Sequence, residues 1–128
     1  MYEDHLYKDL TYKIIGAAFS IHKSLGPVHK ELVYQNALAE ELRLLKIPYK
    51  KEVILPVSYK GKSIGIYKPD FVVDKKVIVE LKALSFLPTT AKSQLSYYLR
   101  GTPYKIALLL NFGTPSLEVH RRIYDRPI

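Results

Sequence analysis

The sequence contains no cysteine among its 128 residues. A disulfide framework and a thiolate metal site are therefore excluded, and the absence is typical of proteins from a reducing cytoplasm. The longest apolar runs, such as Ile106–Leu110, are far shorter than the ~20 residues that a membrane-spanning helix needs. The first ten residues carry acidic side chains and no apolar segment, so we expect no secretory signal. These absences predict a cytoplasmic protein that does not enter a membrane.

Negative charge is also scarce. Lysine and arginine number 20 against 12 aspartate and glutamate residues, which gives a formal net charge of +8. On a chain of this size, such an excess favours a polyanionic partner, with nucleic acid as the first choice and an anionic membrane surface as the second. Solubility alone is the plainer explanation of the charge. The net charge therefore indicates which class of partner could bind, but not whether the protein catalyses a reaction on that partner.

The composition is that of an ordinary globular domain, with 48% hydrophobic and 25% charged residues. A chain of 128 residues can bury about two-thirds of the surface that its unfolded form exposes, which is enough for a core without disulfides or metals. We find no internal repeat, low-complexity tract or flexible linker. Residues 1–128 are therefore predicted to form a single domain.

Hydrophobic periodicity predicts two helices, three strands, a helix and a strand, followed by an uncertain element. The first helix covers about residues 8–24, and the second begins at Pro27 or Val28 and runs to Lys46. The later elements are strands at Glu52–Tyr59, Ser63–Val73 and Val77–Leu84, a helix opened by Pro88, a buried strand at Tyr104–Phe112, and a tail at Ser116–Tyr124 that suits a strand or a helical turn. The order ααβββαβ predicts an α/β fold with a mixed central sheet flanked by helices.

Two carboxylates are predicted to meet in this sheet. Alternation in the strand Val77–Leu84 places Ile78, Glu80 and Lys82 on one face, although the strand is otherwise apolar. Charged groups at such a position are rare unless they are paired or bind a metal. A hairpin between this strand and the preceding one would bring Asp70 beside Glu80, about 5 Å away across adjacent strands. A plain salt bridge between Glu80 and Lys82 is the structural alternative.

Two carboxylates at that distance repel each other, so one takes up a proton unless a cation compensates. Oxygen ligands of this kind suit Mg²⁺ or Mn²⁺, and the sequence has no HExxH motif that would suggest zinc. A metal held by Asp70 and Glu80 can orient and acidify a water molecule. Lys82 can then hold that water or offset the charge that develops on a phosphate.

Two further polar residues are candidates for the same site. Glu31 shares a helical stripe with Tyr34 and Leu38, so the second helix is predicted to aim this carboxylate inward. Its alternative role is to interact with the helix dipole from the first turn. Gln94 lies at the edge of the apolar stripe of the third helix and could either orient a ligand or cap a neighbouring backbone group.

These residues carry a family resemblance. Pro69-Asp70 followed by Glu80-x-Lys82, after a helix with Glu31, resembles the motif of the PD-(D/E)xK phosphodiesterase superfamily. The chain also resembles, more closely, the small bacterial and archaeal GxxExxY proteins over about residues 8–124. The matching segments are Leu25-Gly26-Pro27, Glu31–Tyr34, Leu55–Gly61, Val77–Lys82 and Leu110–Gly113. Val28 stands where the glycine of the GxxExxY motif would fall.

The resemblance implies a restriction-endonuclease-like core and a Mg²⁺- or Mn²⁺-dependent nuclease acting on DNA or RNA. It implies that Asp70 and Glu80 bind the metal, that Lys82 assists the water, and that Glu31 and the backbone carbonyl of Leu81 complete the metal shell. Many such folds cut duplexes as homodimers. Two alternatives stay open, because the superfamily includes members that bind without cutting: a non-catalytic nucleic-acid-binding module and a protein-interaction module.

Overall fold

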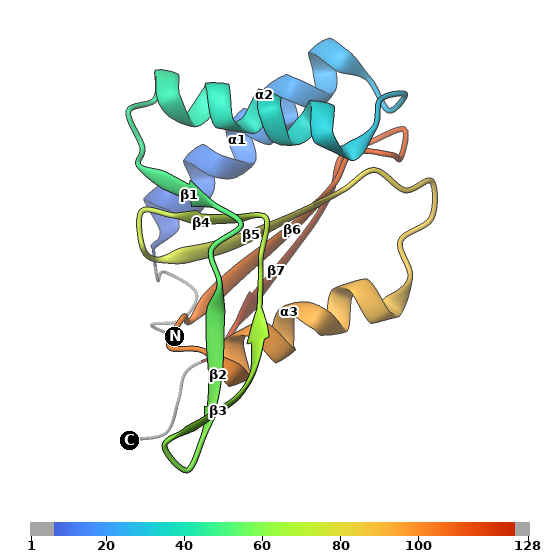
Figure 1. Ribbon diagram of the computed structural model, residues 1–128. Coiled ribbons are helices and arrows are strands. Elements are labelled where there is room, and N and C mark those ends of the chain that lie inside the picture. Colours follow the sequence, from blue (N-terminus) through green and yellow to red (C-terminus); the bar gives the residue numbers. More distant parts are fainter. Residues whose placement is uncertain (1–6, 125–128) are drawn as a thin grey trace.

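The computed structural model describes residues 7–124 (Figure 1). Residues 1–6 and 125–128 lie outside this description, so the expectation that the first ten residues hold no secretory signal falls mostly outside it. The elements are α1 (Lys8–Leu25), α2 (Glu31–Leu44), β1 (Tyr49–Lys51), β2 (Leu55–Tyr59), β3 (Lys62–Tyr67), β4 (Phe71–Val73), β5 (Val77–Lys82), α3 (Thr89–Gly101), β6 (Ile106–Asn111) and β7 (Glu118–Ile123). Within residues 7–124, no helix is long and apolar enough to cross a membrane.

A five-stranded sheet in the order β1-β4-β5-β6-β7 forms the centre of the molecule. Strands β5 and β6 run parallel, and the other neighbouring pairs are antiparallel. Helices α1 and α2 cover one face of the sheet and α3 covers the other (Figure 1). The predicted α/β class, a mixed sheet flanked by helices as in restriction-endonuclease-like folds, is confirmed.

The alternating pattern of β5 explains how both faces of the sheet become core. Val77, Val79 and Leu81 pack with α1 and α2, whereas Ile78 packs with α3. The parallel neighbour β6 is buried along its whole length, as expected for a central strand that is covered on both sides. Glu80 therefore lies on the α3 side of a fully covered strand, where a charged residue is exceptional.

The second helix begins later than predicted. The sequence suggested a start at Pro27 or Val28, but α2 begins at Glu31. Tyr34 explains the difference, because its hydroxyl donates a hydrogen bond to the carbonyl of Gly26 and accepts one from the N–H of His29. These bonds satisfy the backbone of the connection in a non-helical form and leave Glu31 as the first helical residue.

The two predicted strands that precede β5 differ from the structure in different ways. The first begins at Leu55 rather than at Glu52, whose φ of 53° departs from strand geometry, and the unpredicted strand β1 lies before it. Pro69 and Asp70 interrupt the second and separate β3 from β4. As a result β2 and β3 form a two-stranded sheet of their own, joined by a turn in which Lys60 and Gly61 both have positive φ. The ambiguous tail is the strand β7.

Candidate active site

Asp70 and Glu80 are held together by the pairing of β4 with β5. Phe71 lies opposite Val79 in this antiparallel pair, so the residue before Phe71 reaches the residue after Val79. The N–H of Asp70 donates to Oε2 of Glu80 at 2.6 Å, and the N–H of Leu81 donates to Oδ2 of Asp70 at 2.8 Å. The structure thus brings together the two carboxylates that the sequence placed side by side, and backbone donors orient both.

Tyr98 is a member of this site whose contact with Glu80 was not predicted from the sequence; its pattern with Tyr97 and Arg100 suggested stacking on bases near the site instead. Its hydroxyl donates to Oε1 of Glu80 at 3.0 Å, so both oxygens of this carboxylate accept hydrogen bonds. The rings of Tyr67 and Tyr98 pack nearly at right angles to each other, with centroids 4.9 Å apart. The available signal was the position of Tyr98 in the buried stripe of α3, because a buried tyrosine hydroxyl usually finds a polar partner.

Burial makes the charged forms of these carboxyls costly. Loss of solvent raises the pKa of Glu80 to about 7, and the neighbouring charge of Asp70 adds to this rise. Burial also raises the pKa of Asp70, against the opposing effects of the Leu81 N–H and the Lys82 charge. The pKa of Tyr98 is raised by burial first and by Glu80 next, which keeps its hydroxyl protonated as a donor.

Glu31 belongs to the same electrostatic cluster. Its side chain is half-buried at the first turn of α2; burial raises its pKa, and the charge of Asp70 raises it further. The charge of Lys82 lowers the pKa of all three carboxyls and so opposes these rises. When all three are ionised, these carboxylates exceed the charge of Lys82 by two; beyond them, the charges of Glu52 and Lys51 shift the pKa of Asp70 in opposite directions. The cluster formed by Glu31, Asp70, Glu80 and Lys82 is called the acidic cluster below.

Gln94 lies on the Lys82 side of the acidic cluster. It lines, together with Lys82, an open cavity of about 410 Å³ whose remaining walls come from Leu84, Pro88, Thr90, Ala91 and Tyr97. A ligand in this cavity would therefore meet the amide of Gln94 and the ammonium of Lys82 together. Leu81, in contrast, contacts the cluster through its N–H; the contact of its carbonyl with an ion stays a prediction.

The donor chemistry of the acidic cluster fits a hard divalent cation, but with few protein ligands. Over residues 7–124, no three His, Cys, Asp or Glu side chains meet closely enough to hold a metal ion by themselves. Mg²⁺ commonly keeps several waters and takes one or two carboxylates together with phosphate oxygens of the substrate. The pair Asp70 and Glu80, with Glu31 nearby and two excess negative charges, matches that open arrangement rather than a closed cage.

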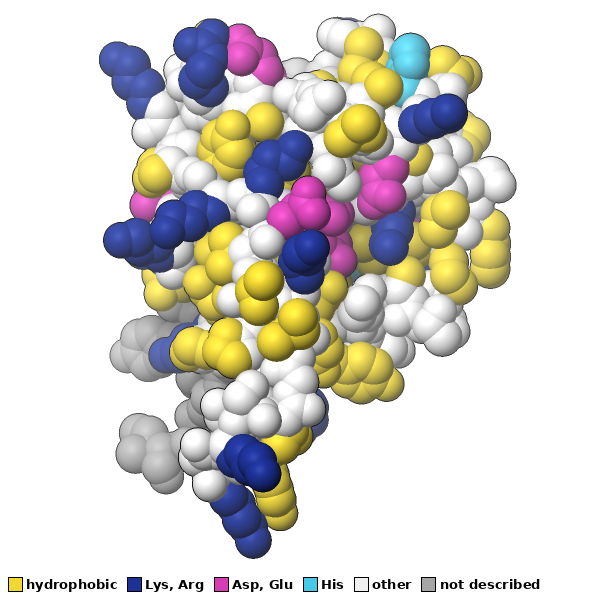
Figure 2. Space-filling view, in the orientation of Figure 1, with side chains coloured by type: hydrophobic (Ala, Val, Ile, Leu, Met, Phe, Trp, Pro, Cys, Tyr) yellow, Lys and Arg dark blue, Asp and Glu magenta, His cyan; other side chains and the backbone are white. Residues whose placement is uncertain are grey.

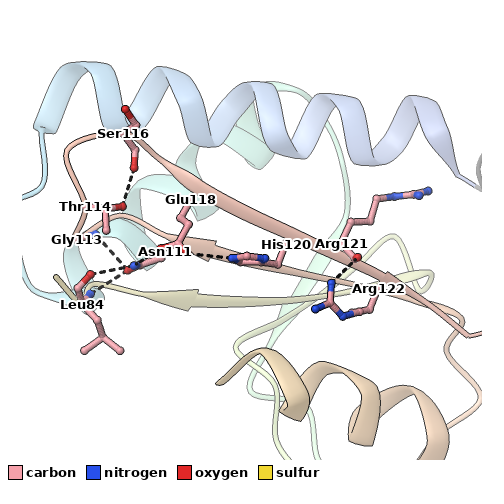
Figure 3. Close-up of polar contacts among 9 residues, drawn as sticks. All are labelled: Leu84, Asn111, Gly113, Thr114, Ser116, Glu118, His120, Arg121 and Arg122. Carbon is pink, nitrogen blue, oxygen red and sulfur yellow. Dashed lines mark hydrogen bonds and ion pairs between the residues drawn. The ribbon is translucent and has the colours of Figure 1, made fainter. Parts of the chain in front are cut away.

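The chain directly after Lys82 is fixed by Asn111 at the end of β6 (Figure 3). The Oδ1 atom of this buried side chain accepts the N–H groups of Leu84 and Gly113, at 2.9 and 3.2 Å, and its amide nitrogen donates to the carbonyl of Leu84 and to Glu118. A Cβ atom at Gly113 would lie 2.4 Å from the backbone nitrogen of Leu84. Only glycine therefore fits at position 113. The contacts of Asn111 and Gly113 thus hold the backbone that follows Lys82 in one conformation.

Comparison with known proteins agrees with this architecture. The family model described as the PD-(D/E)XK nuclease superfamily matches residues 8–123, nearly the whole chain. A search of curated proteins and a search of solved structures return no significant match. The match spans both helices of one layer, the central sheet and α3, and it includes every residue of the acidic cluster. The chain belongs to the PD-(D/E)XK nuclease superfamily.

Proposed function

We propose that the protein is a metal-dependent phosphodiesterase that cleaves DNA or RNA with Mg²⁺ or Mn²⁺. The observation that carries the proposal is the acidic cluster, in which three carboxyls with raised pKa values interact electrostatically with Lys82. A fold gains no stability from burying such an excess of negative charge. A site that binds a divalent cation and a phosphate explains the excess of negative charge.

Each residue of the cluster has a role in this proposal. Asp70, Glu80 and Glu31 would supply oxygen ligands to the cation, joined by the carbonyl of Leu81. The cation would supply positive charge that lowers the pKa of a water molecule and offsets the charge of a phosphate. Lys82 holds the attacking water or offsets charge that develops on the phosphate, and the shared cavity lets Gln94 orient the same ligand.

The net charge of +8 supports a polyanionic substrate. Acidic side chains occupy only a small part of the face shown in Figure 2, near its centre, and lysine and arginine side chains are distributed around them. Phosphates held by those cations would be brought to the cluster in spite of its own negative charge. This arrangement suits a nucleic acid better than a small neutral substrate.

The decisive experiment replaces Asp70 with asparagine, which keeps the shape of the side chain and removes its charge. We expect Asp70→Asn to abolish Mg²⁺- or Mn²⁺-dependent cleavage of nucleic acid, with wild-type folding by circular dichroism. Asp74→Asn is the matched control, because Asp74 lies in the β4–β5 turn, where its side chain is partly exposed and paired with Lys76. Equal cleavage by wild type and Asp70→Asn, after removal of contaminating nucleases, would refute the proposal.

The second candidate is a nuclease-like module that binds nucleic acid, or a protein of a nucleic-acid assembly, without hydrolysis. It is favoured by the lack, over residues 7–124, of three metal-binding side chains that meet at one point. It predicts salt-sensitive binding that does not change when EDTA removes the metal. Metal-dependent cleavage that requires Asp70 would exclude it.

The proposal extends to the family group, the cellular location and the oligomeric state of the protein. The Tyr34 contacts that set the start of α2 support membership in the GxxExxY group, in which Glu31 and Tyr34 are the motif residues. We propose that residues 1–128 act as one domain in the cytoplasm, where nucleic acid and Mg²⁺ are both present. Cutting of both strands of a duplex would require two such sites, and this supports a homodimer on the substrate.

A further inference from the structure

The β2–β3 hairpin is a separate structural unit beside the central sheet. We call residues 55–67 the arm. Its inner face packs on the end of α3, where Tyr67 and Val57 approach Gly101 so closely that a Cβ atom there would lie 3.0 and 3.3 Å from them. From this attachment the arm extends past the body of the molecule and ends in the Lys60–Gly61 turn (Figure 1).

The outer face of the arm is apolar and exposed. Pro56 lies opposite Ile66 across the ribbon, so both side chains point away from the face that Tyr67 and Val57 use. Ile64 is the unpaired residue of a β-bulge in β3, where the register shifts opposite Val57 and Ser58, and its side chain is also exposed. The exposed fractions of Ile64 and Ile66 are 62% and 59%. Adjacent exposed isoleucines on a ribbon are unusual for a surface without a partner.

The charge of the arm identifies the chemistry of that partner. Between Val53 and Pro69 the sequence holds three lysines and no acidic residue, and Lys60 and Lys62 occupy the exposed tip. A second copy of the chain would bring the same positive charges to the interface with no carboxylate on the arm to pair with them, which opposes self-association. A polyanion that also offers apolar surface fits both features.

The arm also lies next to the acidic cluster. Its last residue, Tyr67, packs on Tyr98, whose hydroxyl donates to Glu80, and the chain reaches Asp70 three residues later. In Figure 2 the acidic side chains, the apolar side chains below them and the basic tip of the arm lie on one face of the molecule. A single extended ligand could therefore contact the arm and the cluster together.

We propose that the arm enters the major groove of duplex DNA and positions the duplex on the acidic cluster. This inference rests on the proposed function and specifies its substrate. The major groove of B-form DNA, about 12 Å wide, admits a two-stranded ribbon, whereas the major groove of A-form RNA is too deep and narrow for side chains to read. The six residues of β3 extend roughly 20 Å, which is long enough to follow the groove. Lys60 and Lys62 contact phosphates, and Ile64 and Ile66 contact base edges such as thymine methyl groups.

Binding measured in EDTA tests the arm without cleavage. Fluorescence anisotropy compares duplex DNA with duplex RNA of the same sequence for wild type and for Lys60→Asn with Lys62→Gln; asparagine tolerates the left-handed backbone at position 60, where φ is 50°. We expect wild type to prefer duplex DNA, and the double variant to lower the slope of log affinity against log salt by about 1.8, since each lost phosphate contact accounts for roughly 0.9. Lys13→Gln with Lys23→Gln, which removes two exposed charges from α1, is the matched control and should leave that slope nearly unchanged.

A second variant tests the apolar face. Ile64→Ser with Ile66→Ser should weaken duplex DNA binding at least tenfold, whereas Leu44→Ser, at a residue of α2 that is 59% exposed, should not. Equal binding by wild type and both arm variants, or a preference for duplex RNA, would overturn the inference. So would a dimer in analytical ultracentrifugation that Ile64→Ser with Ile66→Ser converts to monomer, because the face would then join two copies of the chain.

The outcomes separate this inference from the proposed function. If the arm variants bind duplex DNA normally while Asp70-dependent cleavage persists, only the role of the arm is wrong. If the arm variants lose binding but the wild type cleaves nothing with Mg²⁺ or Mn²⁺, the role of the arm in DNA binding is supported and the proposed nuclease activity is refuted.

Discussion

The metal-free protein should lose stability as the pH rises through neutrality, and Glu80→Gln should remove most of that loss. The pKa of Glu80 rises from 4.5 to about 7 on folding, chiefly because the carboxyl is buried. Between these values the folded state holds a proton that the unfolded state has released. Stability therefore falls with increasing pH across this window, and the cost is fully present above it.

The size of the effect follows from the shift. Each pKa unit corresponds to about 1.4 kcal/mol, so a rise from 4.5 to about 7 makes the metal-free protein less stable by on the order of 3 kcal/mol. A neutral glutamine at position 80 does not titrate, and it can still accept a hydrogen bond from the N–H of Asp70 and donate one to Tyr98. The variant should thus keep the local geometry and lose the penalty.

Urea unfolding in EDTA at about pH 5 and about pH 8 measures this difference directly. Between the two conditions the unfolding free energy of the wild type should fall by roughly 2.5 kcal/mol more than that of Glu80→Gln, because part of the loss has already occurred at pH 5. Glu40→Gln is the control, since the exposed carboxyl of Glu40 has its pKa lowered by a hydrogen bond from Arg43; this variant should follow the wild type. A wild-type free energy that changes with pH no more than that of Glu80→Gln would show that the acidic cluster carries no excess charge, and the argument for a cation would fail.

Three further predictions concern the same region. Mn²⁺ should raise the thermal midpoint of the wild type but not of Asp70→Asn, and an equal rise for both in differential scanning fluorimetry would place the ion elsewhere. Tyr98→Phe removes a hydrogen bond that favours the Glu80 carboxylate, so the acidic limb of the pH–cleavage profile should move to higher pH; an unchanged profile would contradict this role. Gly113→Ala should destabilise the fold by about 1–3 kcal/mol or more in urea unfolding, because the new Cβ would meet the backbone of Leu84; a wild-type midpoint would show that the loop yields freely.

The strand Val77–Leu84 shows why much of the fold was predictable from sequence. Its alternation fixed which residues face each helical layer, and the tight turn at Asp74 and Lys75, both with positive φ, fixed the hairpin with β4. These are local patterns, so the sequence could place Asp70 beside Glu80 without knowledge of the remaining chain. The position of Glu31 was also readable from the stripe that it shares with Tyr34, even though the helix was predicted to begin too early.

The parts that were wrong or missed depend on contacts between distant segments. Strand β1 exists because Tyr49–Lys51 pairs with β4, and nothing in its own three residues indicates this. The separation of the arm from the central sheet depends on the backbone of Glu52, whose positive φ has no clear sequence signal. Tyr98 had the spacing of an ordinary core residue, and its bond to Glu80 joins residues 18 positions apart.

The burial of Glu80 differs in kind from the other polar burial in this protein. Among residues 7–124, the buried polar or charged side chains are Thr11, Glu80, Thr102 and Asn111. Thr11 and Thr102 donate to carbonyls within one helical turn, and the Asn111 amide is neutral and bonded on both its oxygen and its nitrogen. Glu80 also accepts hydrogen bonds, but its carboxylate lies close to that of Asp70, and the two negative charges repel each other. Hydrogen bonding does not remove this repulsion. Since an apolar residue would serve the core better at this position, the charge has to be explained by what binds there.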